Sequence, residues 1–264
     1  MKQKNIILIG SEGSLGKDLK KVLISKNNKI VCADNSFSKK TNFVKKSQNL
    51  YEHYLDVKSE ESVKNLHNIL RKKIKKIDGI IYSITAKTKD FYFPIEKFSY
   101  FSWKQVIDTE LGGAFLIAKY FGGTLAKQKK GSVVFISSIY GIVGNDHSIY
   151  KGSNLAKVYS NKNQSNKIYS SSAYNASKGG LISLTKFLAG YWPGRNIRFN
   201  CVSPGGIKNN KENKTFVKKY SKKVPLNRKA NLREISEAII FLLSDKSNYI
   251  NGHNLVVDGG FTTW

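Results

Sequence analysis

The stretch NIILIGSEGSLG, residues 5–16, joins a short apolar run to three glycines. The run Ile6–Ile9 is apolar on both faces and stops at Gly10, which is typical of a buried parallel strand. Apolar residues then recur at helical spacing, so we expect a helix to begin near Ser14. Glycines at such a junction let the backbone approach a pyrophosphate, whose charge the helix N-terminus stabilises. The stretch therefore predicts a dinucleotide-binding turn.

An acidic side chain follows at the end of the second predicted strand. The apolar run Ile30–Ala33 ends at Asp34. At this place in a dinucleotide-binding unit, a carboxylate accepts hydrogen bonds from the adenosine ribose and repels the additional phosphate of NADP. NAD is therefore the expected cofactor, and NADP stays open because Lys39 and Lys40 lie nearby. The alternative for Asp34 is an ordinary turn residue.

Strand and helix patterns alternate along the rest of the chain. Five further segments have strand patterns: residues 51–57, 79–83, 132–136, 198–202 and 254–257. Helical spacing of apolar residues marks residues 63–70, 103–118, 176–191 and 235–243. This order is typical of βαβ units. We expect one α/β domain over residues 1–264, with a Rossmann-type doubly wound parallel sheet of about seven strands and helices on both faces.

A polar stretch at residues 144–172 interrupts this alternation. Loops of this length inside a compact domain are usually functional or disordered. We expect a lid over the active site, and the alternative is a mobile surface insertion. Lysines can meet phosphates and aromatic rings can stack on sugars, so an anionic substrate and an uncharged one both stay open. The residues concerned are Lys151, Lys157, Lys162 and Lys167, with Tyr150, Tyr159 and Tyr169.

The formal net charge of the chain is +27, from 45 Lys and Arg against 18 Asp and Glu. A charge this large is typical of nucleic-acid or membrane-surface binding, which favours clustered arginines. Only five of the 45 basic residues are arginines, and the lysines are spread along the chain. A lysine-rich composition is therefore the preferred explanation, and we expect neither a nucleic-acid partner nor a membrane.

Two cysteines, Cys32 and Cys201, are too few for a disulfide framework or a cysteine-based metal cluster. No metal is expected, and a reducing compartment suits the chain. No apolar run approaches the roughly 18 residues of a membrane span, and the first residues lack the pattern of a signal peptide. These features predict a soluble, cytoplasmic protein.

The helix expected after the polar stretch begins with the run Tyr174-Asn-Ala-Ser-Lys178. Its first and last residues share one helix face. A neighbouring ammonium lowers the pKa of a phenol, which can then exchange a proton with a carbonyl or alcohol oxygen while hydride moves to or from nicotinamide. The pattern alone is common on solvated helices. It gains weight because Ser137 and Ser138 end a predicted strand, at the sheet edge where ligands bind.

Together these segments resemble the short-chain dehydrogenase/reductase family along essentially the whole chain. Several motifs match in the right order, so the resemblance is specific. The matching segments are the glycine turn at 10–16, the adenine-holding pair Asp56-Val57, the serine segment at 138–141, the pair Tyr174 and Lys178, the segment Ser203–Ile207 and the run Asp258-Gly-Gly260. The resemblance selects Ser138, not Ser137, as the catalytic hydroxyl.

The resemblance implies an NAD(P)-dependent oxidoreductase that transfers hydride between nicotinamide and a carbonyl or secondary alcohol. Ser138 would bind the substrate oxygen, Tyr174 would transfer the proton, and Lys178 would tune the phenol and bind the nicotinamide ribose. The implied cofactor-binding residues are Gly10, Ser11, Gly13, Ser14, Leu15, Gly16, Asp34, Asp56, Val57, Tyr82, Tyr174, Lys178, Pro204, Gly205 and Ile207. A homo-oligomer, dimer or tetramer, is also implied, and Phe115, Tyr120, Phe187 and Leu188 are candidates for its interface or for the core.

Within the family, the chain looks like the flagellin-modification and surface-glycan group of oxidoreductases. The segments behind this resemblance are 138–141, 149–152, 203–207 and 254–264. It implies a small-molecule substrate that is a sugar or a sugar nucleotide.

Two departures from the family pattern concern the site. Tyr82-Ser-Ile-Thr85 stands where the family has Asn-Asn-Ala-Gly, and Glu110 stands where it has an asparagine that holds a relay water. Ser14 also replaces a glycine of the turn. A carboxylate at position 110 can hold the water, or it can pair directly with Lys178 and blunt catalysis. These departures motivate one alternative, a cofactor-binding pseudoenzyme with a regulatory or scaffold role. A carbonyl reductase of the 3-oxoacyl type is a further alternative.

Overall fold

The computed structural model describes the chain except residues 1–2, 156–157 and 159–167. Its strands form one eight-stranded sheet in the order β3-β4-β2-β1-β5-β6-β7-β8, and every neighbouring pair is parallel except β3 and β4. The strands are β1 (Asn5–Ile9), β2 (Lys29–Asp34), β3 (Val44–Ser47), β4 (Leu50–Tyr54), β5 (Gly79–Tyr82), β6 (Gly131–Ile136), β7 (Ile197–Pro204) and β8 (Asn254–Val257). The doubly wound α/β fold expected from the sequence is confirmed.

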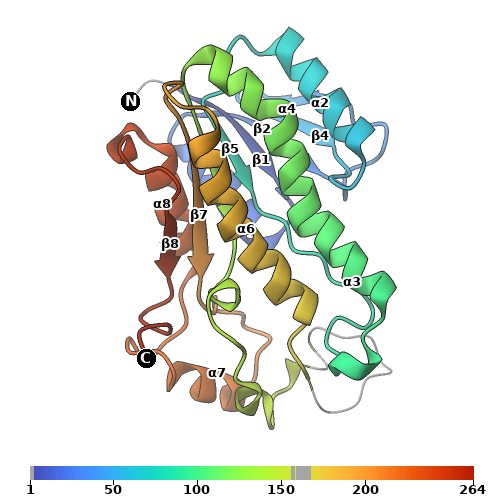
Figure 1. Ribbon diagram of the computed structural model, residues 1–264, viewed down its shortest axis with the longest axis vertical. Helices are drawn as coiled ribbons and strands as arrows, with labels where there is room; N and C mark the ends of the chain where they lie inside the picture. The colour runs from blue at the N-terminus through green and yellow to red at the C-terminus, as the bar shows by residue number, and fades with distance from the viewer. Residues whose placement is uncertain (1–2, 156–157, 159–167) are drawn as a thin grey trace.

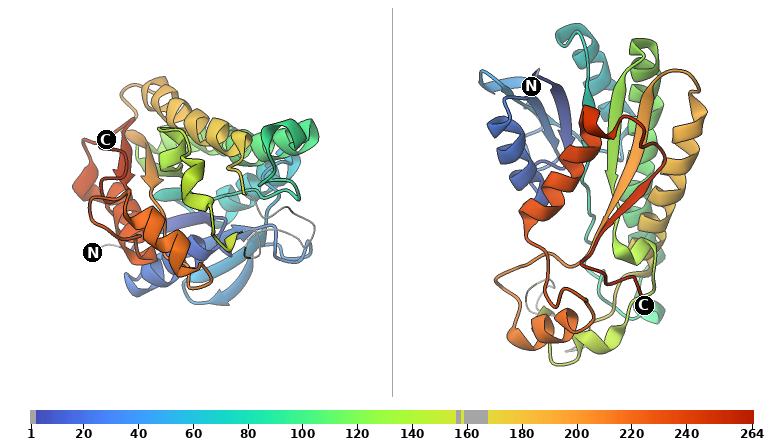
Figure 2. Two further views of the ribbon diagram at one scale, coloured as in Figure 1. Left: turned by 90° about the horizontal axis from the view of Figure 1, so that it is seen from below. Right: turned by 90° about the vertical axis from the view of Figure 1, so that its left-hand side faces the viewer.

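Helices cover both faces of this sheet (Figure 1; Figure 2, right). On one face Leu66, Phe121 and Leu181 belong to one buried cluster, and on the other Leu19 and Ile239 belong to a second. The helices are α1 (Ser14–Ser25), α2 (Glu60–Lys73), α3 (Tyr100–Ile107), α4 (Gly113–Gln128), α6 (Ser172–Tyr191), α7 (Lys214–Ser221) and α8 (Leu232–Leu243). No described helix has the length and apolar character to cross a membrane.

Several elements differ from their sequence expectations. Helix α7 was not expected, and β4 ends at Tyr54, short of the strand expected over residues 51–57. The additional strand β3 has the sequence VKKS, is exposed throughout and pairs antiparallel with β4 at the sheet edge. An edge strand with no buried face lacks the alternating pattern that would reveal it. The long helix expected over residues 103–118 is divided, because the π-helical turn η2 (Asp108–Gly112) separates α3 from α4.

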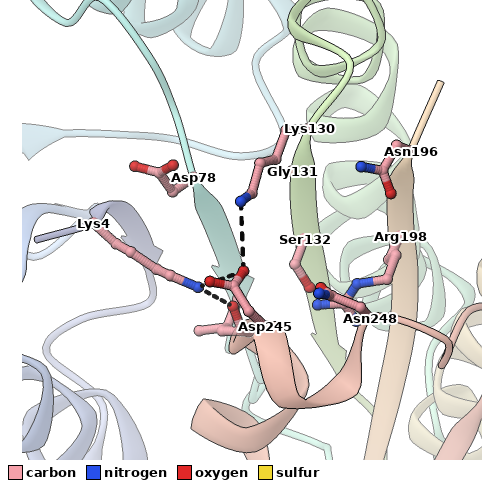
Figure 3. A pocket seen from close by; sticks show the side chains of 10 residues that line it. Lys4, Asp78, Lys130, Gly131, Ser132, Asn196, Arg198, Asp245 and Asn248 are labelled. Atoms are coloured by element: carbon pink, nitrogen blue, oxygen red, sulfur yellow. Dashed lines mark hydrogen bonds and ion pairs between the residues drawn. The ribbon is translucent and has the colours of Figure 1, made fainter. Parts of the chain in front are cut away.

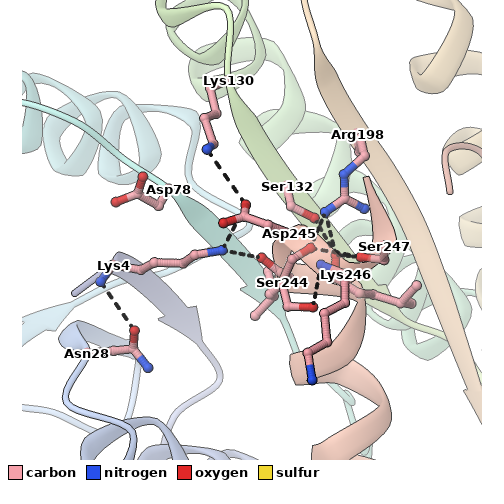
Figure 4. A network of polar contacts seen from close by, with 12 residues as sticks. Lys4, Asn28, Asp78, Lys130, Ser132, Arg198, Ser244, Asp245, Lys246 and Ser247 are labelled. Carbon is pink, nitrogen blue, oxygen red and sulfur yellow. Dashed lines mark hydrogen bonds and ion pairs between the residues drawn. The ribbon is translucent and has the colours of Figure 1, made fainter. Parts of the chain in front are cut away.

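A polar network lies at the amino-terminal end of the strands (Figure 4). The Arg198 guanidinium donates to the carbonyls of Leu242, Ser244 and Ile250 at 2.8, 3.2 and 3.1 Å. Lys4 donates to the carbonyl of Leu243 at 3.1 Å. These cations satisfy carbonyls at the C-terminus of α8, where the helix dipole favours positive charge. The cavity beside them has about 20 Å³ (Figure 3), room for roughly one water, so the network is structural.

The predicted site residues gather at the opposite, carboxyl-terminal end of the strands. Gly10 follows β1, Asp34 ends β2, Ser138 follows β6 and Pro204 ends β7. In Figure 1 this end lies at the bottom, toward which β7 and β8 point and where α7 is found. Ligands of open α/β sheets bind at this end.

Candidate active site

The glycine turn after β1 has no room for side chains at two positions. Gly10 has a φ of +81°, and a Cβ there would lie 2.2 Å from the Ser83 carbonyl oxygen. A Cβ on Gly16 would lie 2.2 Å from the Gly10 carbonyl oxygen. The turn is therefore compact because both residues are glycine.

The N-terminus of α1 opens toward solvent beside this turn. Gly13 is the N-cap and no side chain caps the helix. Gly13 and Ser14 are exposed, Leu15 is half-buried and Ser11 is buried. Uncapped backbone N–H groups at a helix N-terminus form an anion site. The turn therefore fits a dinucleotide pyrophosphate, and Ser14 stands in it without a clash.

Asp34 lies at the end of β2 against the glycine turn, as expected. Its Oδ2 accepts the Glu12 N–H at 2.9 Å, and its Oδ1 accepts the N–H and hydroxyl of Ser36 at 2.9 and 2.7 Å. A carboxylate has about four lone-pair positions, so roughly one remains for a ribose hydroxyl. The side chain thus has a structural role in fixing the turn that the sequence did not reveal, and its cofactor contact stays a prediction.

The residues expected to hold the adenine, Asp56 and Val57, differ from Tyr82 in where their side chains lie. Asp56 is half-buried and accepts the Lys58 N–H at 3.0 Å, and Val57 is buried. The Tyr82 side chain does not face the cofactor edge: it is fully buried, and its hydroxyl donates to the Thr109 carbonyl at 2.5 Å. Its position in β5 turns the ring into the core against Phe135, with ring centroids 6.2 Å apart. The assignment of the Tyr82 side chain to cofactor binding is therefore not supported.

The segment after β7 is held by two tight packing contacts. A Cβ on Gly205 would lie 2.8 Å from the Asp258 Cα, and a Cβ on Gly206 would lie 2.5 Å from the Tyr220 ring. Ile207 pairs with Ala230 in a parallel bridge. Pro204, Gly205 and Ile207 therefore lie at the sheet edge on a rigid backbone, as a nicotinamide-flanking segment requires.

Ser138, Tyr174 and Lys178 come together at this edge. Tyr174 lies in the first turn of α6, whose N-cap Ser171 accepts the Tyr174 N–H at 3.4 Å. The Lys178 Nζ lies 5.3 Å from the centroid of the Tyr174 ring, and a side-chain hydrogen bond connects Tyr174 with Ser138. The Ser137 hydroxyl instead donates to the Lys178 carbonyl at 2.7 Å. This geometry supports Ser138 as the substrate-facing hydroxyl.

The pKa of the Tyr174 phenol is raised above its ordinary value, and burial is the largest cause. Lys178 acts in the opposite direction and lowers this pKa, as expected, while the charge of Glu110 raises it. The net direction differs from the expectation because the sequence did not show the burial of the phenol, and because Glu110 pairs directly with Lys178.

Glu110 is fully buried in η2 and lies against the lysine. Its Oε2 is 3.2 Å from the Lys178 Nζ and accepts the Ser177 hydroxyl at 2.6 Å, and its Oε1 accepts the Ala86 N–H at 3.0 Å. Of the two arrangements considered from the sequence, the structure shows direct pairing with Lys178.

The described part of the insertion packs against α7 at the carboxyl end of the sheet (Figure 2, left). Ile149, Leu155 and Ile168 share a buried cluster with Phe216 and Tyr220 of α7. Lys151 is exposed, while Lys157, Lys162, Lys167 and Tyr159 lie outside the described residues. The covering position is compatible with a lid, and of the four lysines singled out in the insertion only Lys151 lies among the described residues.

Phenol and amide groups lie beside Tyr174. The Tyr140 and Tyr150 phenols lie close enough to shift the pKa of one another, the Asn145 side chain lowers the pKa of both, and the Tyr174 phenol raises that of Tyr150. The Asn145 Nδ2 is buried without a close hydrogen-bond partner. Burial raises the pKa of Tyr140 and of Tyr150, so both phenols stay neutral. Sequence analysis missed Asn145 as a site residue, and its place just after the serine segment was the only available signal.

Comparisons with known proteins agree with this geometry. The family model described as short chain dehydrogenase matches residues 4–157, and the one described as enoyl-(acyl carrier protein) reductase matches residues 150–262. Two curated proteins are each 28% identical to the chain: a 3-oxoacyl-(acyl-carrier-protein) reductase of Thermotoga maritima, with 97% of each chain covered, and the post-translational flagellin modification protein A of Campylobacter coli, with 99% of each covered.

A solved structure is similar along the whole fold. The short chain dehydrogenase of Leptospira borgpetersenii with bound NAD+ is 28% identical, covers 99% of this chain and 94% of its own, and superposes with a TM-score of 0.84. Because the family model matches more than half of the chain and the serine, tyrosine and lysine meet at the expected edge, the chain belongs to the short-chain dehydrogenase/reductase family of NAD(P)-dependent oxidoreductases.

Proposed function

We propose that the protein transfers hydride between a nicotinamide cofactor and a carbonyl or secondary alcohol of a sugar or sugar nucleotide, in the biosynthesis of a surface glycan. The observation that carries this proposal is the group formed by Tyr140, Tyr150 and Asn145 beside Tyr174. Neutral phenols and the Asn145 Nδ2, which is buried without a hydrogen-bond partner among the described residues, match the hydroxyl groups of a sugar ring, whereas an acyl chain would leave that amide unsatisfied. The flagellin-modification relative agrees with this substrate class.

The site residues have distinct tasks in this reaction. Ser138 donates a hydrogen bond to the substrate oxygen, and Tyr174 gives that oxygen a proton during reduction or takes it during oxidation. Lys178 places its ammonium 5.3 Å from the centroid of the Tyr174 ring and lowers the pKa of that phenol, while its pairing with Glu110 limits the positive charge that it offers there. The bound nicotinamide supplies or accepts the hydride.

NAD is the cofactor that we propose. The residues present fit a dinucleotide, since Gly10 and Gly16 leave no room for a Cβ and the N-terminus of α1 is uncapped. Asp34 at the end of β2 disfavours a second phosphate on the ribose. Titrating the protein with NADH and with NADPH, followed by nucleotide fluorescence, should give at least about tenfold tighter binding of NADH. Equal affinities would contradict the preference.

A substrate panel tests the main proposal. The protein is mixed with NAD+ or NADH and with sugar phosphates, nucleotide sugars or 3-oxoacyl thioesters, and nicotinamide absorbance is followed. We expect turnover of a sugar compound and little with the thioesters. Preferential turnover of a thioester would establish the second candidate, a 3-oxoacyl-type reductase, which the Thermotoga relative favours. Cofactor binding without turnover of either class would indicate a pseudoenzyme.

We also propose a homo-oligomer in the cytoplasm. Phe115 on α4 and Phe187 on α6 are more than half exposed, which suits an interface between copies. Leu188 is buried, and the Tyr120 hydroxyl donates to Glu60 at 2.7 Å, so these two candidates belong to the fold itself. Light scattering of the protein and of Phe187→Asp should show a smaller particle for the variant.

A further inference from the structure

All the hydrogen-bonding capacity of the Lys178 ammonium is directed at the protein. Its Nζ donates to the carbonyls of Ile84 and Ile136 at 3.0 and 3.1 Å and pairs with the Glu110 Oε2 at 3.2 Å. An ammonium has three N–H donors, so two are used on the carbonyls, and the carboxylate lies at ion-pair distance from the same nitrogen. Both side chains of the pair are about 1% exposed or less.

Glu110 is equally well satisfied. Besides Lys178, it accepts the Ser177 hydroxyl and the Ala86 N–H. Buried ions need this degree of pairing, because an uncompensated charge in a low-dielectric interior is very unfavourable. Glu110 and Lys178 therefore form one neutral unit.

Tyr82, which also departs from the family pattern, contacts η2. The Tyr82 hydroxyl donates to the Thr109 carbonyl next to Glu110. A Cβ at position 113 would lie 2.2 Å from the Tyr82 hydroxyl oxygen, so Gly113 is required opposite this tyrosine. π-helical turns inside α-helices often occur at functional sites. Here Tyr82, Gly113 and Glu110 form one matched set that directs a carboxylate at the lysine.

We propose that Glu110 is a positioning residue that clamps Lys178 without an intervening water, so that the lysine reaches Tyr174 as half of a neutral ion pair and not as a free cation. This inference rests on the proposed oxidoreductase function for its kinetic consequence, but the clamp itself is a property of the cofactor-free protein.

No other described group around the Tyr174 phenol supplies the positive charge that Glu110 neutralises on Lys178. Ser138, after β6, and Tyr150, in the 3-10 turn His147–Tyr150, are neutral. Lys87, after β5, lies over the Tyr92 ring at 5.9 Å from its centroid. The Cys201 thiol in β7 interacts with Lys178, but burial raises its pKa to about 12. The charge balance at Tyr174 thus depends on Glu110 and Lys178.

Direct titration of the cofactor-free protein is the first test. The difference in phenolate absorbance between the protein and Tyr174→Phe isolates this one tyrosine. If the clamp exists, the Tyr174 phenolate should form only above about pH 10, the ordinary value for tyrosine. A phenolate that forms near neutral pH in the unaltered protein would overturn the proposal.

Removing the charge at position 110 is the second test. Glu110→Gln keeps the shape and leaves Lys178 as a free cation, so the Tyr174 titration should move down by about one pH unit or more, and the pH profile of oxidation with it. Ser177→Ala is the matched control, because it removes one hydrogen bond to Glu110 but keeps the ion pair, and its titration should be unchanged. An unshifted titration in Glu110→Gln, or an equal shift in both variants, would contradict the clamp.

The two tests stay separate from the proposed function. If Glu110→Gln does not fold, a Tyr174 phenolate that forms near neutral pH in the unaltered protein would still overturn the clamp. If the titrations behave as expected but no sugar is turned over, the substrate proposal fails and the clamp stands.

Discussion

Lys178 at the carboxyl end of the sheet and Arg198 at the amino end are both buried cations with carbonyl partners. Arg198 donates to three backbone carbonyls around the end of α8. Lys178 donates to two, and its third partner is the carboxylate of Glu110. Tyr174 and Ser138 adjoin only the second cation. A buried cation thus indicates a reactive site only where a group that can transfer a proton lies beside it.

Tyr174→Phe should impair catalysis at the carboxyl end of the sheet without changing the stability of the fold. Removing the proton donor should lower kcat by about 10²- to 10⁴-fold, the usual contribution of a positioned acid or base. Cofactor binding and thermal stability should change little, because the ring stays. Steady-state kinetics with the substrate found in the panel provides the measurement, and turnover at the unaltered rate would remove Tyr174 from the mechanism.

Arg198→Met should lower the stability of the fold at the amino end of the sheet without changing turnover per folded molecule. It removes one donor from the carbonyls of Leu242, Ser244 and Ile250, which keep hydrogen bonds from other side chains, so the free energy of unfolding should fall by about 2 kcal/mol. Urea unfolding measures this change, with Lys130→Met as an exposed control from the same network, for which about 0.5 kcal/mol or less is expected. Lost turnover per folded molecule with unchanged stability would show that this end takes part in function.

Tyr150→Phe tests whether a neutral hydroxyl beside Tyr174 contacts the substrate. Loss of one hydroxyl beside Tyr174 should reduce kcat/KM for a sugar substrate by about tenfold, the value of one hydrogen bond of roughly 1.4 kcal/mol. Tyr169→Phe is the matched control from the same insertion, since that ring lies near His147 at 5.7 Å between centroids. Equal effects of the two variants would argue against a specific contact of Tyr150.

Lys151→Met has the smallest expected effect. This exposed lysine should change KM by about threefold or less, and only for an anionic substrate, because solvent and salt screen surface charge. Comparing a sugar phosphate with its neutral sugar at low and high salt provides the measurement. A large, salt-resistant effect would show that Lys151 contacts the substrate directly.

Much of this fold could be read from local patterns. The buried strands β1, β5 and β6 have continuous apolar runs, and each was predicted from them. β3 was missed because its four exposed residues carry no periodic signal. The pairing of Tyr174 with Lys178 was predictable because helix geometry alone puts residues four apart on one face.

The electrostatics of the site could not be read in the same way. The Tyr82 side chain was assigned to the cofactor, but its hydroxyl meets the Thr109 carbonyl in the core. Whether Glu110 would hold a water or pair with Lys178 depended on the π turn, which has no local sequence signature. The raised pKa of Tyr174 depends on burial by segments far apart in the chain.

The amino-acid sequence by itself determined the alternation of strands and helices, the compact glycine turn and the choice of candidate proton-transfer residues, because these depend on neighbours within a few positions. Only the tertiary structure decided which partners Lys178 has, whether Asp34 also fixes the turn, and which hydroxyl groups surround Tyr174. Those contacts join residues tens of positions apart, and their strength depends on how completely the fold removes them from water.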